Sequence, residues 1–359
     1  MGDPLRVPSP PLLERIMAAL SRRRLLTSAL AVGLVAPAGS ALAAPNTSKD
    51  AKLVEGTTFR LTIMQTNDLH GHLQEVVETA DGRLHENNVA KYATLIDQVR
   101  SEEENVLVVD GGDLFLRGEF EEFQSALETE ILKEIGYAAT VIGNNDFRVF
   151  PAGDGTAEDS YEQLKDYQRT LNFPILCGNV VYEDTGKLLP FAKASITKSY
   201  SGVKVGLIGV TTMKPEVREW EDVAGLDFID PVEALEGGLL ADASSKSHVN
   251  VILSHAGNDD DHRIATLGGV DVVLGADTHR IIRTPETEVN ADGAVVPITQ
   301  GGGEQEHYLT RLDLEFTVQG GEYVLTTFDG SLYEDLSDVE EDPKVVAIID
   351  RYRAMLAEG

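Results

Sequence analysis

The sequence LTIMQTNDLHGH at residues 61–72 places an apolar run directly before a cluster of carboxylate, amide and imidazole side chains. The run Leu61–Gln65 has the composition of a buried central strand in a parallel sheet. In open α/β sheets, functional sites assemble beyond the carboxyl ends of such strands. The stretch therefore predicts an α/β fold with one part of a site just after residue 65.

The same arrangement recurs along the chain. Four further apolar runs have the same strand-like composition: Val106–Val109, Thr140–Ile142, Val249–Leu253 and Val270–Leu274. Each precedes a polar motif, and these motifs are Asp113, Asn144-Asn145-Asp146, His255 and Asp277-Thr278-His279. Each motif alone is typical of polar surface or of a core histidine. Because parallel strands end at one edge of a sheet, the ordered set predicts a single site built from all of them.

The residue types in these motifs favour a pair of metal ions. Two divalent cations about 3.5–4 Å apart need a bridging carboxylate and further ligands on each side. Asp113 is the best bridge, because Gly111 and Gly112 let the backbone come close, and Asp110 is placed to brace the turn. In an extended chain, two residues that are two positions apart point to the same side, which would direct Asp68 with His70 at one metal. The predicted ligands are Asp68, His70, Asp113, Asn144, His255, Asp277 and His279.

Three residues near the motifs have ordinary interpretations as well as functional ones. His72 either contacts substrate or is a solvated loop histidine. Arg117 either holds a phosphate or forms a surface ion pair with Glu119 or Glu121. Cys177, the only cysteine, is expected to be a buried structural thiol.

The chain resembles the calcineurin-like metallophosphoesterases in five motifs: Thr66-Asn67-Asp68-Leu69-His70-Gly71-His72, Gly112-Asp113, Gly143-Asn144, Leu253-Ser254-His255 and Thr278-His279. Within these it is similar to the 5′-nucleotidases and to the thiosulfohydrolases. The resemblance implies an α/β fold of four layers, an αββα sandwich. It implies that one metal is held by Asp68, His70, Asp113 and His279. It implies that the other is held by Asp113, Asn144, His255 and Asp277.

The implied activity is hydrolysis of a phosphodiester or an activated phosphomonoester, with a metal-bridging hydroxide as the attacking group. Two alternatives remain open. One is a thiosulfohydrolase-like hydrolase of sulfur esters, and the other is a degenerate metal-binding or interaction module without catalysis.

Three departures from the family pattern affect the expected chemistry. Asn145 stands where the family has a histidine that protonates the leaving group, and loss of a general acid typically costs about 10²- to 10⁴-fold in rate. Asn145 and His72 are then expected only to orient the ester. Asp277 stands where the family has a histidine, and this harder ligand favours manganese, magnesium or calcium over zinc, with manganese the leading expectation. The family's second domain, which holds the nucleoside, is expected to be missing, with a partner protein as one source of it.

The chain begins with a segment that has the features of a twin-arginine signal peptide, placed at residues 1–44. This segment contains the arginine motif Ser21-Arg22-Arg23-Arg24-Leu25-Leu26 and then an apolar run at 27–36. The small residues of Ala41-Leu42-Ala43 form a cleavage pattern. The run is shorter than the ~20 residues that span a bilayer, so a stable membrane span is not expected. The expected destination is a Gram-negative periplasm, or the cell exterior in an archaeon. The other predicted parts are a linker at 45–57, the metallophosphoesterase domain at 58–335 and a linker-like helix at 336–359.

The charge of the chain limits its partners. It has 30 basic and 60 acidic residues, for a formal net charge of −30. Such a field repels nucleic acids and anionic membranes. A small phosphorylated or sulfur-ester substrate would therefore depend on local positive charge, which divalent cations supply.

Periodicity predicts the remaining elements. Expected helices are Val89–Arg100, Glu119–Ile135, Glu158–Leu171, Pro231–Ala243 with Asp230 as N-cap, and Asp342–Leu356 with an apolar face of Val346, Ile349, Tyr352 and Leu356. Expected strands are a hairpin of Phe191–Tyr200 with Val203–Thr211, and antiparallel strands at Val295–Thr299, Leu309–Val318 and Glu322–Phe328. This order fits a two-layered β sandwich flanked by helices.

Overall fold

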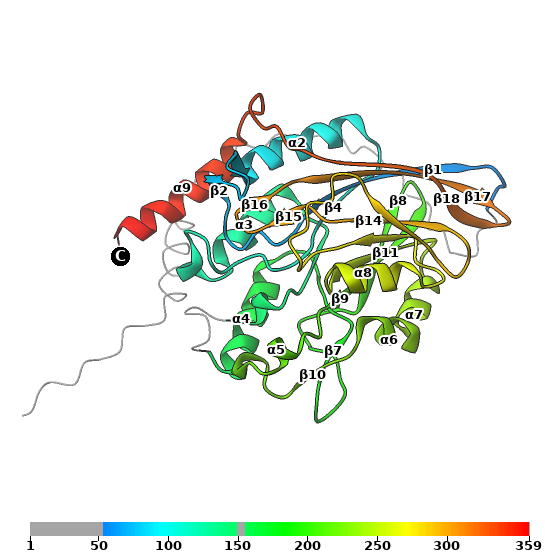
Figure 1. The fold of residues 1–359 in the computed structure, drawn as a ribbon, viewed down its shortest axis with the longest axis horizontal. Helices are drawn as coiled ribbons and strands as arrows, with labels where there is room; N and C mark the ends of the chain where they lie inside the picture. The colour runs from blue at the N-terminus through cyan, green and yellow to red at the C-terminus, as the bar shows by residue number, and fades with distance from the viewer. Residues whose placement is uncertain (1–52, 149–154, 359) are drawn as a thin grey trace, which may run out of the picture. The chain divides into compact units, whose positions relative to one another are not determined.

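The computed structural model describes residues 53–148 and 155–358, so the predicted signal peptide at 1–44 lies outside the described residues. Strands form two six-stranded sheets (Figure 1). The first sheet has the spatial order β18 (Glu322–Leu332), β17 (Thr310–Gln319), β1 (Thr58–Thr66), β4 (Val106–Asp110), β5 (Ala139–Val141), β6 (Ile175–Leu176). The second has the order β13 (Glu286–Val289), β14 (Val295–Thr299), β12 (Val272–Leu274), β11 (Val249–His255), β9 (Val203–Thr211), β8 (Ser195–Tyr200).

The predicted strands that precede the motifs are central and parallel. β1, β4, β5 and β6 pair in parallel in the first sheet, and β9, β11, β12 and β14 do so in the second. Antiparallel strands stand at both edges of the second sheet and at the β18 edge of the first, including the predicted hairpin of β8 with β9 and the β17–β18 pair around Gly320-Gly321. β14 differs from the expectation of an antiparallel strand. It pairs in parallel with β12 and antiparallel only with β13, because it continues the second sheet rather than the first.

The main core lies between the two sheets. Alternate residues of each strand share a face, so Leu61 and Ile63 of β1 pack into the same apolar cluster as Val251 of β11 and Leu274 of β12. A second cluster on the outer face of the second sheet joins Ile252 and Val273 to the helices that cover it. Helices also cover the other sheet, which gives the predicted four-layer αββα sandwich.

Four helices lie on the side of the first sheet: α2 (Val89–Glu102), α3 (Ala126–Ile135), α4 (Ala157–Thr170) and α9 (Pro343–Glu358). Of these, α9 packs on α2 and α3. Helices α6 (Pro231–Ala234), α7 (Leu240–Ser244) and α8 (Asn258–Ala265) belong to the second sheet's side, with a π-helical turn at Leu235–Leu239. The remaining elements are β2 (Gln74–Glu78), β3 (Leu84–Asn88), β7 (Val180–Tyr182), β10 (Leu226–Phe228), β15 (Gly302–Gly303), β16 (Glu306–His307), α5 (Pro215–Arg218) and the 3₁₀ turns Glu121–Phe123, Asn145–Phe147 and Glu221–Val223. Across the described ranges, no helix combines the length and apolar character that crossing a bilayer requires.

Three predicted helices differ in detail. The helix expected from Glu119 begins only at Ala126, because Gln124 has φ +54 and breaks the helical backbone. The helix expected over Pro231–Ala243 is interrupted at Gly238, whose φ is +124, although Asp230 caps it as predicted by accepting from the N–H of Val232. The C-terminal helix buries a rotated face made of Val345, Ile348, Ile349 and Tyr352.

Candidate metal centre

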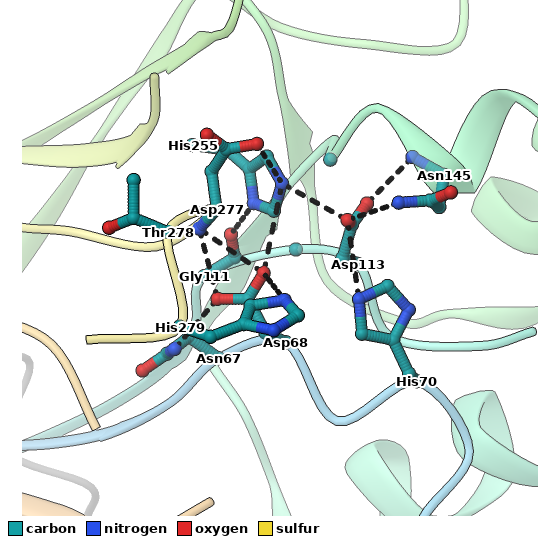
Figure 2. Close-up of polar contacts among 12 residues, drawn as sticks. Asn67, Asp68, His70, Gly111, Asp113, Asn145, His255, Asp277, Thr278 and His279 are labelled. Carbon is teal, nitrogen blue, oxygen red and sulfur yellow. Dashed lines mark hydrogen bonds and ion pairs between the residues drawn. The ribbon is translucent and has the colours of Figure 1, made fainter. Parts of the chain in front are cut away.

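The five motif loops meet beyond the carboxyl ends of their strands. Asp68 and His70 follow β1, Asp113 follows β4 and Asn144 follows β5. His255 ends β11, and Asp277 and His279 follow β12. Figure 2 shows the side chains of Asp68, His70, Asp113, His255, Asp277 and His279 turned toward one another from both sheets.

Left-handed backbone conformations position this set, which corrects the expectation of extended loops. Such conformations cost non-glycine residues about 1–3 kcal/mol each, and they are concentrated at functional sites. The residues with positive φ are Asp68 (+51°), His70 (+47°), Asp113 (+52°), Asp277 (+76°) and His279 (+53°). Asp68 and His70 therefore reach the same cluster through a tight turn rather than through strand alternation.

One group of donor atoms consists of Asp68, His70 and His279, whose candidate ligand atoms lie within 4.8 Å of one another. His279 Nε2 lies 3.5 Å from Asp68 Oδ1. The His70 and His279 rings meet edge to face, with centroids 5.3 Å apart. Asp68 and His70 are buried and His279 is half-buried, so this group is open to solvent on the His279 side.

A second group consists of Asp68, Asp113 and His255, again with candidate ligand atoms within 4.8 Å. His255 Nε2 lies 3.3 Å from Asp113 Oδ2 and 3.8 Å from Asp277 Oδ1. The other ring nitrogen, Nδ1, donates to the Gly111 carbonyl oxygen at 2.7 Å. This bond orients the ring and directs Nε2 at the carboxylates, as in histidines that bind metals.

Asp113 belongs to the second group and also faces His70 of the first. Its Oδ2 atom faces His70 Nε2 at 3.5 Å and His255 Nε2 at 3.3 Å. Burial raises the pKa of Asp113, but the two imidazoles and the Asn145 amide outweigh burial and hold that pKa below its usual range. Gly112 makes the close approach possible, because a Cβ there would lie 2.7 Å from the Gly143 nitrogen. One carboxylate oxygen thus faces an imidazole from each group, as a bridging ligand would.

The donor set fits two divalent cations. Among the described residues, both ring nitrogens of His70 and the Nε2 atom of His255 are buried without a hydrogen-bond partner. Buried polar atoms of this kind are rare in proteins, and a cation between Asp113 and these rings would satisfy them. Carboxylates and imidazoles together suit manganese, iron or zinc.

The two asparagines after β5 contact different carboxylates. The Asn144 amide group lies 2.9 Å from Asp277 Oδ1. With its nitrogen on that side, the amide donates a hydrogen bond to Oδ1. With its oxygen on that side, two oxygen atoms face each other. The Asn145 backbone N–H donates to Asp113 Oδ1 and its side-chain amide to Oδ2, each at 2.7 Å. Arg117 donates to Asn145 Oδ1 at 3.2 Å.

Buried carboxylates support the loops from behind. Asp110 accepts from the Gly112 N–H at 2.9 Å and so braces the turn as predicted. Asp146 accepts from the backbone N–H groups of Asp113 and Leu114, each at 3.0 Å. Burial raises the pKa of Asp110 to about 7 and that of Asp146 to about 8. The role of Asp146 was not predicted, although its place in the Asn144-Asn145-Asp146 motif is a signal that could have indicated it.

Two other contacts were missed. Asn67 donates to Asp68 Oδ2 at 2.7 Å, and Lys214 donates to Asp277 Oδ1 at 2.7 Å. Asn67 could have been noticed through its adjacency to Asp68. Lys214 carries only a weak signal, a lysine just after a central strand in an acidic chain.

The residues with two interpretations are placed as follows. The His72 ring contacts the Glu75 carboxylate. Arg117 pairs with Glu304 instead of Glu119 or Glu121, because the loop after Asp113 turns it toward the metal centre, while Glu119 pairs with Arg353. Cys177 is a buried free thiol as predicted, and burial raises its pKa to about 12.

Comparisons with known proteins show the family of the chain and its fold. A family model described as calcineurin-like phosphoesterase matches residues 61–280. The 5′-nucleotidase of Rattus norvegicus is 30% identical over 326 residues, which cover 83% of this chain and 53% of that protein. The chain therefore spans about half the length of the curated relatives it matches.

Two solved structures share the fold. A 5′-nucleotidase precursor from Thermus thermophilus has a TM-score of 0.71 at 24% identity, covering 84% of this chain and 59% of that one. The sulfate thiohydrolase SoxB from the same organism has a TM-score of 0.64 at 17% identity, covering 83% of this chain and 61% of that one.

Proposed function

Because the chain belongs to the family of calcineurin-like phosphoesterases, we propose that it is a metal-dependent hydrolase of phosphate esters. The observation that supports this best is the convergence of His70 Nε2 and His255 Nε2 on Asp113 Oδ2, at 3.5 and 3.3 Å. Bound divalent cations would supply positive charge for an anionic ester and lower the pKa of water. Asp68, His70, Asp113 and His279 would hold one cation, and Asp113, Asn144, His255 and Asp277 the other.

Backbone and side-chain groups of this chain hold the ligands in place. The Gly111 carbonyl orients His255, and Asn145 restrains both oxygens of Asp113. Asn67 orients Asp68 in the same way. Such partners fix ligand orientation, and their loss typically costs 10- to 100-fold in metal affinity or activity.

The proposed substrates are phosphodiesters and monoesters with a good leaving group. An asparagine amide has no proton that it can give up near neutral pH, so Asn145 cannot act as the acid for the leaving group. A leaving group that is stable as an anion has less need of that proton. The nucleotide specificity of the relatives is not part of the proposal, because the chain spans about half their length.

Manganese is the proposed metal. Asp277 adds a third carboxylate beside Asp68 and Asp113, and hard oxygen ligands shift preference away from zinc. Three imidazoles keep the site suited to a transition metal rather than to calcium alone.

The test is hydrolysis of an activated phosphodiester and an activated phosphomonoester by the Mn²⁺-loaded full chain. The proposal expects turnover of at least one of them, and loss of that turnover in Asp113→Asn. Absence of turnover on both esters, with metal content confirmed, would contradict it. His262→Gln is a matched histidine control, since His262 lies outside the metal centre and contacts Glu286 and Glu288.

Export by the twin-arginine route to the periplasm is a separate proposal. It is supported by Arg22-Arg23, the apolar run after them and the small residues Ala41 and Ala43. Replacing both arginines with lysine should keep the chain in the cytoplasm of a fractionated host. Unchanged export of that variant would contradict it.

A further inference from the structure

Lys214 forms an ion pair with Asp277, the carboxylate that stands where the family pattern has a histidine. Its Nζ atom lies 2.7 Å from Oδ1 and 2.6 Å from Oδ2. The Asp277 side chain is 2% exposed and the Lys214 side chain 40% exposed. The ammonium group therefore reaches from solvent onto a buried carboxylate of the metal centre.

Loops after two strands on either side of β11 bring the pair together. Lys214 follows β9 and Asp277 follows β12, and these strands flank β11, which carries His255. The Lys214 N–H donates to Thr212 Oγ1 at 3.2 Å, and α5 begins at the next residue. Asp277 is held from the other side, because its N–H donates to the Asp68 carboxylate at 3.0 Å. Both partners are thus fixed by their own loops.

Lys214 contacts both carboxylate oxygens of Asp277, and one of them, Oδ1, also faces the other ligands. Asp277 Oδ1 lies 3.8 Å from His255 Nε2 and 2.9 Å from the Asn144 amide. A cation held by these three residues would share Oδ1 with the ammonium group. Two like charges around one oxygen oppose each other, so Lys214 works against metal binding at this position.

The same lysine has the opposite effect on an anionic ligand. With a histidine at position 277, the loaded centre would contain two carboxylates, Asp68 and Asp113, and the aspartate adds a third negative charge. The positive charge of Lys214 offsets the added negative charge of Asp277. In a chain with a net charge of −30, a phosphate depends on positive charge at the centre itself.

We propose that Lys214 is a positioning residue that compensates Asp277, weakening the second metal site while strengthening the binding of phosphate to the loaded centre. This inference rests on the proposed function, since it assumes an anionic phosphate at two cations. It explains why a carboxylate at position 277 is compatible with a phosphate ligand. The two effects have opposite signs, which a purely structural role for Lys214 would not produce.

The test uses Lys214→Met in the full chain, with isothermal titration calorimetry. Mn²⁺ is titrated into metal-free protein, and inorganic phosphate is then titrated into protein saturated with Mn²⁺. We expect the second Mn²⁺ to bind about tenfold more tightly and phosphate about tenfold more weakly, a magnitude that allows for solvent screening of a partly exposed lysine. Lys214→Gln should reproduce both shifts.

Two controls isolate the charge. Lys214→Arg keeps the positive charge and should leave both affinities near those of the wild type. Lys246→Met removes a surface lysine from a comparable pair, Lys246 Nζ to Asp242 Oδ2 at 2.6 Å, and should change neither affinity.

Unchanged or weaker binding of the second Mn²⁺ in Lys214→Met, or unchanged binding of phosphate, would overturn the inference. Neither readout uses ester turnover. Failure of the wild type to hydrolyse any ester would therefore count against the proposed function. The titrations test the role of Lys214 independently of that result.

Discussion

Asn145 holds Asp113 at both carboxylate oxygens, through its backbone N–H to Oδ1 and its side-chain amide to Oδ2, each at 2.7 Å. Asn145, which the family resemblance predicts to stand in place of an acid histidine, thus restrains the carboxylate that faces His70 and His255. Its side-chain amide is committed to Asp113 and Arg117, so its role in the structure is positional.

Asn145→His should restore a proton donor near the leaving group. We expect turnover of a monoester with a poor leaving group to rise by about tenfold or more, toward the 10²- to 10⁴-fold that a general acid provides. Turnover of an activated ester should not rise, because its leaving group needs no proton and the variant loses the side-chain amide that contacts Asp113. Steady-state kinetics on the two esters measures the difference, and equal changes on both would show that proton donation does not limit the rate.

Asn145→Ala serves as the comparison. It removes the amide from Asp113 without adding an acid, so turnover of both esters should fall, by up to the 10- to 100-fold typical of such partners. Full activity in this variant would show that the contact with Asp113 has no role.

His255→Ala should remove one of the two cations. The Gly111 carbonyl then loses its donor, and one group loses its imidazole, while Asp68, His70 and His279 remain in place. Elemental analysis should show bound Mn²⁺ falling from about two toward one per chain. Two cations retained in this variant would contradict the assignment of His255.

Metal should stabilise the fold, and Asp113 should mediate most of the effect. Mn²⁺ at a hundred times its dissociation constant should add about 2.7 kcal/mol per bound cation to the free energy of unfolding of the wild type. Asp113→Asn should lose most of this gain, because Asp113 is a ligand of both cations in the proposed assignment. Thermal melts with and without Mn²⁺ measure it, and an equal gain in both proteins would argue against a shared ligand.

Glu128 should make the stability of the metal-free protein depend on pH. It is fully buried, neither of its carboxylate oxygens has a hydrogen-bond partner within the described residues, and burial raises its pKa to about 8 from 4.5. Because the folded-state pKa is raised, its favourable contribution is complete below pH 4.5 and is lost as the pH rises to about 8.

Glu128→Gln should therefore gain stability relative to the wild type between pH 4.5 and 8, by a few kcal/mol at the upper end. The measurement is how the stability difference between Glu128→Gln and the wild type changes with pH. The effect of the new amide does not change with pH, so it cancels. Glu122→Gln, at an exposed position, should show no such change. A difference that stays constant with pH would mean that Glu128 is ionised in the folded protein.

Sequence predicted the scaffold well, because buried parallel strands are continuous apolar runs. The predicted strand Val249–Leu253 is an example. The observed strand β11 begins at the same residue and continues two residues further, to His255. It failed at the helix expected from Glu119. The left-handed backbone at Leu116, Arg117 and Gln124 has no signature in hydrophobic periodicity.

The candidate ligands were predictable from their order after strands, whereas their partners were not. Lys214 and Asp277 are 63 positions apart and meet only because β9 and β12 flank the same strand. The pairing of Arg117 with Glu304 likewise depends on two loops whose residues both have positive φ. Contacts of this kind follow from loop geometry rather than from local pattern.

The most direct measurement is the Mn²⁺ content of the purified full chain, determined together with its turnover of an activated phosphodiester and an activated phosphomonoester. The account predicts about two Mn²⁺ per chain and hydrolysis of at least one ester. Fewer than one metal per chain with no hydrolysis of either ester would contradict it.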